Sequence, residues 1–95
     1  MSHDVNEKNR AWCKGLIGSY VARGHDRPDR IAKCLATTMA KGELDGASLK
    51  AILATINNET VQPFLGRVGS VFHQPERLER FHLVRKTIDQ VLSGC

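Results

Sequence analysis

A chain of 95 residues is long enough for one helical domain over residues 1–95, but too short for a hydrophobic core plus a deep active-site cleft. Its composition, 41% hydrophobic and 25% charged, is that of a folded domain and excludes a disordered tail. The net charge of +4 favours acidic partners or nucleic acid, although many proteins with such a charge bind neither.

No apolar segment reaches the length of a membrane span. Residues 1–7 lack the basic and apolar regions of a signal peptide, so we expect a cytoplasmic protein with no membrane partner.

The cysteines, Cys13, Cys34 and Cys95, form no C-x-x-C pair, which argues against a disulfide framework or a zinc knuckle. Cys34 is expected in the core, and a cross-linking role for Cys95 stays open.

The first predicted helix runs from Asp4 to about Arg23. Asp4 and Glu7 have the spacing of a capping box, and Gly24 supplies a helix stop. One face carries the single Trp and the single Tyr of the chain. The apolar residues of this predicted helix are Trp12, Leu16, Ile17, Tyr20 and Val21.

A helical hairpin over residues 26–57, with a break at residues 41–45, is the strongest structural signal in the sequence. Pro28 suits the first turn of its first helix, which needs no N–H there. Gly42 can end that helix, and Asp45 can cap the next one. Leu44 and Leu49 have the spacing of a hydrophobic staple across this cap. The two apolar faces consist of Ile31, Cys34, Leu35, Thr38 and Met39, and of Leu49, Ile52, Leu53 and Ile56.

After a connector at residues 57–59, the sequence predicts a further helix over residues 61–72. Gly66 and Gly69 each lower its helix propensity by about 1 kcal/mol relative to Ala, so it should be the least stable element or be broken near Gly69. The alternative is that the two glycines let another backbone approach closely. The apolar face of this predicted helix is Val61, Phe64, Leu65, Val68, Val71 and Phe72.

The last predicted helix begins at Pro75 and runs to about Ser93, with Gly94 as its stop. No segment shows the alternation of a strand. We therefore predict an all-α fold, a small bundle of four to five helices with a central helical hairpin and a long C-terminal helix. The near-heptad apolar residues of that last helix are Leu78, Phe81, Val84, Ile88 and Val91.

Patterns for catalysis and metal binding are weak. Ser70 and His73 are close in sequence, but no G-x-S-x-G elbow or orienting carboxylate accompanies them. Gly66 and Gly69 follow no strand and lack the Lys of a phosphate-binding loop. We therefore expect no enzyme, no catalytic residue, no cofactor and no metal site. No two of the possible metal ligands share a helix face at ligand spacing, these being His3, His25, His73, His82 and the cysteines.

The basic residues allow a nucleic-acid hypothesis. The second helix of the hairpin has one basic side chain, Lys50, and no Arg, so it is a poor reader of base edges. Asp26 and Asp29 are interleaved with the basic cluster at i, i+4 spacing, as on a solvated helix face. Contacts to phosphates or to an acidic partner would then fall to Arg23, Arg27, Arg30 and Lys33.

Surplus apolar surface favours protein–protein binding. Five short amphipathic elements in so small a chain cannot all bury their apolar faces internally, because surface area grows relative to volume as domains shrink. The competing interpretation is that each face belongs to the core. The two faces predicted to bind a partner are Trp12, Leu16 and Tyr20, and Phe64, Val68 and Phe72.

A set of positions agrees with a known family, namely Ser19-Tyr20, Gly24, Leu35, Met39, Gly42, Ile52, Ile56, residues 84–89 and Val91-Leu92. In these residues the chain resembles the small all-helical bacterial regulators of biofilm formation and acid resistance. The resemblance implies a homodimer that acts in gene regulation without catalysis, on DNA or on another protein. In size and helicity the chain also resembles quorum-sensing antiactivators, which sequester a transcription factor.

These observations together predict a non-enzymatic, cytoplasmic, homodimeric bacterial regulator. An apolar helical face would dock on a partner protein, a transcription factor in the antiactivator interpretation, with basic side chains at the rim. The expected anchors are Trp12, Tyr20, Phe64 and Phe72. The alternative is a dimeric DNA-binding transcriptional regulator that contacts phosphates through its basic residues.

Overall fold

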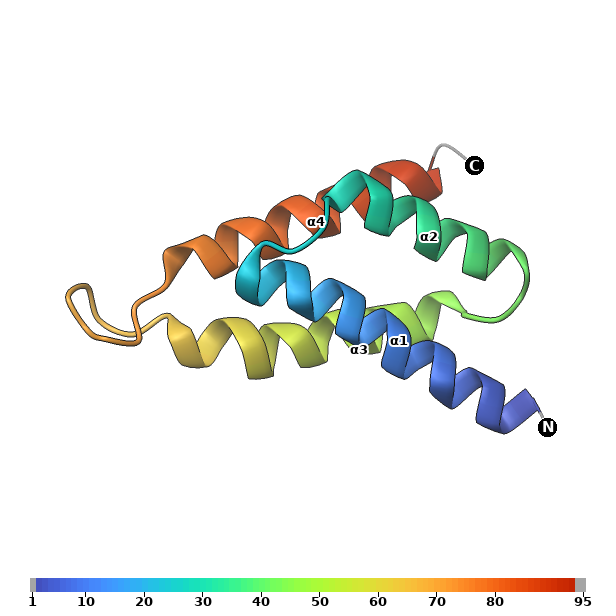
Figure 1. Cartoon of the computed structure of the whole chain (residues 1–95), viewed down its shortest axis with the longest axis horizontal. Helices are drawn as coiled ribbons and strands as arrows, with labels where there is room; N and C mark the ends of the chain where they lie inside the picture. The colour runs from blue at the N-terminus through green and yellow to red at the C-terminus, as the bar shows by residue number, and fades with distance from the viewer. Residues whose placement is uncertain (1, 94–95) are drawn as a thin grey trace.

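The computed structural model describes residues 2–93, with side chains from residue 7 onward. Its α-helices are α1 (Ser2–Arg23), α2 (Pro28–Ala40), α3 (Gly46–Ile56) and α4 (Pro75–Ser93). A π-helical turn, η1 (Asn57–Val61), and a 3-10 turn, η2 (Gln62–Phe64), follow α3 directly. The predicted small all-α bundle is confirmed (Figure 1).

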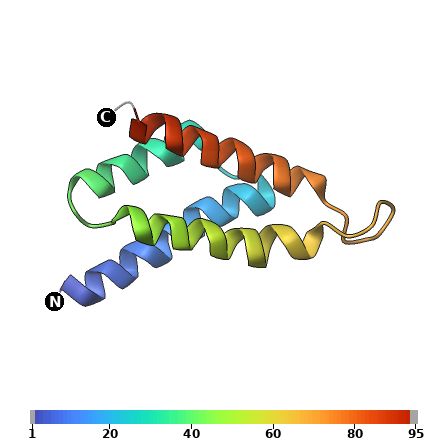
Figure 2. The same ribbon diagram turned by 180° about the vertical axis from the view of Figure 1, so that it is seen from behind.

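The helices are arranged around α1, which contacts each of the other three α-helices. The closest packing is between α2 and α4, which lie along one another at one side of α1. Seen from behind, α1 crosses between α3 and α4, and these two helices make few direct contacts (Figure 2). The resulting molecule is elongated, with principal dimensions of 47 × 28 × 20 Å.

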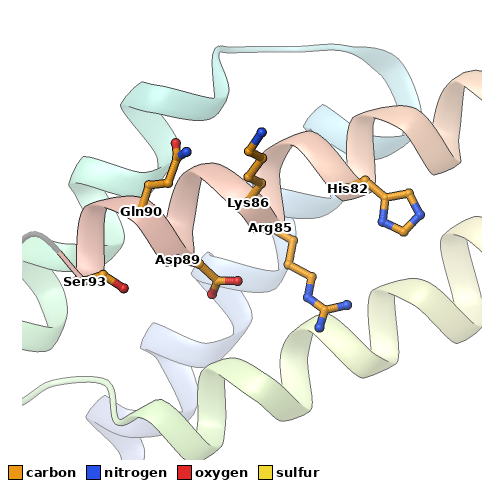
Figure 3. A pocket seen from close by; sticks show the side chains of 6 residues that line it. All are labelled: His82, Arg85, Lys86, Asp89, Gln90 and Ser93. Carbon is orange, nitrogen blue, oxygen red and sulfur yellow. The ribbon is translucent and has the colours of Figure 1, made fainter.

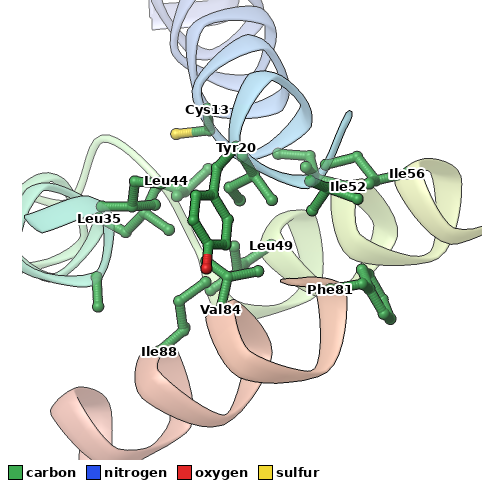
Figure 4. Close-up of a cluster of buried hydrophobic side chains, with 14 of the residues drawn as sticks. Cys13, Tyr20, Leu35, Leu44, Leu49, Ile52, Ile56, Phe81, Val84 and Ile88 are labelled. Carbon is green, nitrogen blue, oxygen red and sulfur yellow. The ribbon is translucent and has the colours of Figure 1, made fainter. Parts of the chain in front are cut away.

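The core lies where α1 crosses the other helices (Figure 4). All four α-helices contribute, because each carries an apolar stripe at helical spacing. Full burial of each large aliphatic side chain stabilises the fold by roughly 1.5–3 kcal/mol. Both faces predicted for the hairpin point inward, with Cys34, Thr38, Met39 and Leu53 only half-buried. The side chains with the least exposure include Ile17, Val21, Ile31, Leu35, Ile56, Val84 and Ile88.

The hairpin between α2 and α3 forms as the sequence predicts. Gly42 takes a φ of +75°, and its N–H donates to the carbonyl of Met39 over 3.0 Å. The Asp45 carboxylate accepts a 2.6 Å hydrogen bond from the Ser48 N–H, which caps α3 and lowers the pKa of Asp45. Leu44 and Leu49 are both buried, as expected of a hydrophobic staple.

The junction of α1 and α2 is held by an arginine from α4. Gly24 ends α1 with a φ of +72°. The Arg80 guanidinium donates to the carbonyl of Val21 over 2.8 Å and to that of Ala22 over 3.2 Å. These carbonyls have no partner within α1, so Arg80 satisfies them and places a cation at the negative end of the helix dipole.

Two helix starts differ from the predictions. α2 begins at Pro28, two residues after Asp26, because Asp26 has a φ of +73° and its carboxylate accepts the Arg27 N–H over 2.9 Å. α1 extends two residues beyond the predicted start at Asp4. Asp4, which would form the predicted capping box with Glu7, and Gly94 and Cys95 lie outside the residues whose side chains are described.

The helix predicted over residues 61–72 is wrong, and so is the connector at residues 57–59. The helix of α3 continues through η1 and η2, and residues 65–74 then form a loop. Two glycines explain the difference. Gly69 has a φ of +92°, which interrupts a right-handed helix. A Cβ at Gly66 would lie only 3.2 Å from the Ser70 Oγ, so the chain folds back closely there.

Replacing Arg80 with Ala should lower the free energy of unfolding by about 2 kcal/mol, because two carbonyls lose a charged donor. Arg85→Ala is the matched control on the same helix, since the Arg85 side chain is exposed. It should change the free energy by less than about 0.5 kcal/mol. Urea unfolding followed by circular dichroism measures both, and equal losses would contradict the capping role of Arg80.

Stability should also decline at alkaline pH because of Cys13, which is fully buried. Burial raises the pKa of its thiol from 9.0 to about 11. The folded state therefore favours the neutral thiol. The resulting stabilisation is complete at a pH below the thiol pKa of the unfolded chain, and it is lost as the pH rises toward the thiol pKa of the folded chain. The free energy of unfolding should fall by on the order of 2–3 kcal/mol across that interval.

The variant Cys13→Ala should lack this part of the alkaline decline, whatever its loss of stability at neutral pH. Cys34→Ala keeps Cys13 and should decline like the original chain. Urea titrations at a series of pH values measure the difference. An identical slope for Cys13→Ala and the original chain would show that other groups cause the decline.

Candidate functional site

The loop over residues 65–74 projects from one end of the bundle, between η2 and α4 (Figure 1). Its two ends are joined at the base by backbone contacts. The Gln74 N–H donates to the Phe64 carbonyl over 2.6 Å, and Leu65 and His73 form an antiparallel bridge. The Nδ1 atom of His73 lies 2.8 Å from the carbonyl oxygen of Gly66. The loop therefore leaves and rejoins the bundle at one point.

The turn of the loop is closed by its own hydrogen bonds. The Ser70 N–H donates to the carbonyl of Arg67 over 2.8 Å, and the Ser70 carbonyl accepts the N–H of His73 over 3.1 Å. The Ser70 hydroxyl accepts the N–H of Phe72 over 3.2 Å. Because these bonds connect most of the loop backbone, the loop has a defined conformation and not only a defined attachment.

Arg77, in the first turn of α4, fixes the base of the loop. Its guanidinium carbon lies 3.7 Å from the centre of the Phe64 ring, a cation–π contact. Its Nε donates to the Gln74 side chain over 2.7 Å, and its Nη1 donates to the Thr60 carbonyl over 3.0 Å. Partial burial, and then the charges of Arg80 and Arg23, lower the pKa of Arg77. It stays charged at neutral pH.

The loop presents apolar side chains to solvent, from Phe72 beside its base to Val68 and Val71 further out. Val68 is 89% exposed, Val71 is 86% exposed and Phe72 is 59% exposed, and we call these three residues the apolar tip. Arg67 is exposed beside them. A scattered exposed Leu needs no explanation, but three exposed apolar side chains within five residues of one hydrogen-bonded loop are a candidate binding site.

Within each of the two predicted partner-binding faces, the residues differ in exposure. Tyr20 is only 7% exposed and belongs to the core, so the prediction that it anchors a partner is corrected. Trp12 remains 46% exposed on α1, beside the half-buried Leu16. Phe64 is half-buried under Arg77, whereas Val68 and Phe72 lie in the apolar tip.

Sequence reasoning missed two contributors. Val71 was assigned to a helical face but not to a binding site, because a helix was expected where the loop lies. Arg77 was not singled out, because nothing in its neighbouring sequence shows that it contacts Thr60, Phe64 and Gln74. Its position in the first turn after Pro75 was the only available hint.

The basic residues proposed for phosphate contacts, Arg23, Arg27, Arg30 and Lys33, are all exposed near the start of α2. The predicted pair of Asp26 and Arg30 forms at 4.0 Å, a weak surface contact.

Among the described residues, no group of three His, Cys, Asp or Glu side chains is placed to hold a metal ion. Nor does any helix in that range combine the length and apolarity needed to cross a lipid bilayer.

Comparison of the chain with protein-family models, with curated proteins and with solved structures finds no match.

The apolar tip should contribute almost nothing to folding stability. Val68→Ser and Phe72→Ser should each change the free energy of unfolding by less than about 0.5 kcal/mol, because more than half of each residue's surface is already exposed to solvent. Ile17→Ala, in the core, should cost about 2–5 kcal/mol. Urea unfolding measures all three. A loss of more than about 1 kcal/mol for Phe72→Ser would mean that the ring is part of the core.

Proposed function

We propose that this protein is a non-enzymatic regulatory module that binds a partner protein by inserting the apolar tip into a pocket or groove. The observation that carries the proposal is the combination of exposure and order. Val68, Val71 and Phe72 stand in water on a loop whose backbone is closed by hydrogen bonds and clamped by Arg77. Exposed apolar side chains that are grouped in this way usually mark an interaction site.

The energetics favour insertion. Burying one large apolar side chain is worth roughly 1.5–3 kcal/mol, so three of them can supply the centre of an interface. A loop that is ordered before binding also loses less conformational entropy on association. Arg67 beside the tip suits a polar rim, where it would meet carboxylates of the partner.

The identity of the partner follows from the resemblance and not from the geometry. As in the antiactivators, the partner would be a transcription factor, and occupation of its pocket would block its action. The dimer is part of the same proposal. Exposed Trp12 and half-buried Leu16 on α1 form the apolar surface, outside the loop, best suited to pairing two copies.

A DNA-binding regulator is the second candidate. It is favoured by the exposure of Arg23, Arg27, Arg30 and Lys33, which could contact phosphates without base readout. Such binding would weaken steeply with salt, whereas insertion of an apolar tip would change little.

The double variant Val68→Ser/Phe72→Ser should weaken binding of the partner about 100-fold, since two anchors are lost. The partner is first captured on the full chain from the native host, identified by mass spectrometry, purified and then titrated by calorimetry. Leu83→Ser is the control, because Leu83 is an exposed apolar residue on α4 outside the loop. It should bind as the original chain does.

Three results would contradict the proposal. The tip variant could bind the purified partner with unchanged affinity, or Leu83→Ser could lose as much affinity as the tip variant. In a parallel retention assay on duplex DNA, salt-sensitive retention that Arg27→Glu/Lys33→Glu abolishes and the tip variant preserves would favour the DNA-binding alternative. Light scattering on the same variants gives the oligomeric state.

A further inference from the structure

A second surface lies between α3 and α4, on the face opposite the view of Figure 1 (Figure 2). Both helices pack on α1 but make few contacts with each other, which leaves a groove with a volume of about 330 Å³. The groove is lined by Lys50, Leu53 and Ala54 of α3, by Asn57 at the start of η1, and by Phe81 and Arg85 of α4.

The floor of the groove is apolar. This floor is the name we give to the apolar lining residues, which are the half-buried Leu53, the exposed Ala54 and the buried Phe81. Small residues let another helix approach closely, at the 8–10 Å axial separation typical of packed helices. From Lys50 to Asn57 the groove follows α3 for about 10 Å, at 1.5 Å per residue, which is the length of about two helical turns.

The walls of the groove are cationic. Lys50 on α3 and Arg85 on α4 are exposed, and neither is paired with another residue in the described part of the chain. The Arg85 side chain extends from α4 toward α3 (Figure 3). α3 contains no acidic residue that could neutralise the pair.

The positive charge continues along α4. Arg85 also lines a shallow depression next to the groove, with His82 and Lys86 beside it and one carboxylate, Asp89, a turn further along. Unpaired cations over an apolar floor attract a ligand that carries both apolar groups and negative charge.

We propose that this groove binds an acidic amphipathic helix of a partner protein. Apolar residues of that helix would pack on Leu53, Ala54 and Phe81, and its carboxylates would pair with Lys50 and Arg85. A nucleic-acid strand would match the cations, but Phe81 is only 5% exposed and offers no open ring face on which a base could stack. The proposal is independent of the apolar tip, which is built from other residues.

The test titrates the isotope-labelled full chain with a 14-residue helical peptide that has Leu on one face and Glu on both flanks. A matched peptide carries Lys in place of Glu. We expect saturable shifts of the amide resonances of the groove residues with the Glu peptide only. Lys50→Glu/Arg85→Glu should weaken binding about tenfold or more, because attraction becomes repulsion.

Lys33→Glu/Lys41→Glu is the control, since it changes the net charge equally at exposed sites outside the groove and should change the affinity less than twofold. Val68→Ser/Phe72→Ser should bind the peptide normally, which separates this proposal from the function of the apolar tip. Where glutamate at position 50 or 85 disturbs the fold, the Gln substitutions Lys50→Gln/Arg85→Gln replace it.

Equal binding of the Lys peptide, or equal weakening by Lys33→Glu/Lys41→Glu, would overturn the proposal, because general electrostatics would then explain the result. Shifts confined to residues 65–74 would place the peptide on the loop instead. A single-stranded oligonucleotide that saturates the groove where the Glu peptide does not would also overturn it and identify a nucleic-acid site.

Discussion

Hydrogen bonds from two arginines of α4 connect this helix to the ends of other helical segments that are distant in sequence, around the buried core. A helix leaves its last carbonyl groups without partners, and a chain of this size has little spare core to hide them. Arg80 satisfies the end of α1, and Arg77 satisfies η1 through Thr60. Because both arginines lie within the first turns of α4, the start of this helix sets the positions of α1 and of the loop base.

The clamp at the base explains how an apolar tip can be both exposed and ordered. If residues 61–72 were a helix, Phe64, Val68 and Phe72 would share one face and could pack together on the bundle. The loop separates them. Phe64 is held under Arg77, while Val68 and Phe72 are carried away from the core on backbone that Ser70 closes with hydrogen bonds. The apolar tip is thus exposed although the backbone of the loop is hydrogen-bonded.

Local sequence signals were enough for the helical framework. The stop at Gly42 with the cap at Asp45, and the stripes containing Ile31, Leu35, Ile52 and Ile56, each depend on neighbours in the chain and were predicted correctly. Gly66 and Gly69 indicated a weak or broken helix, but the apolar spacing imitates a helix, so the extent of the loop was not predicted. Tyr20 was misassigned for a different reason. Whether an apolar face is buried depends on which helix covers it, and that is a property of the tertiary arrangement.

The two candidate surfaces differ in the physics of recognition. The apolar tip offers area to bury and one nearby charge, so its affinity would depend on shape and on the order of the loop. The groove between α3 and α4 offers little apolar area but two unpaired cations, so its affinity would depend on charge and fall with ionic strength. A partner with an acidic helix could be captured quickly by the groove and held by the tip. Two modest contacts on one rigid body then combine through effective concentration, which is how a domain of this size can reach useful affinity.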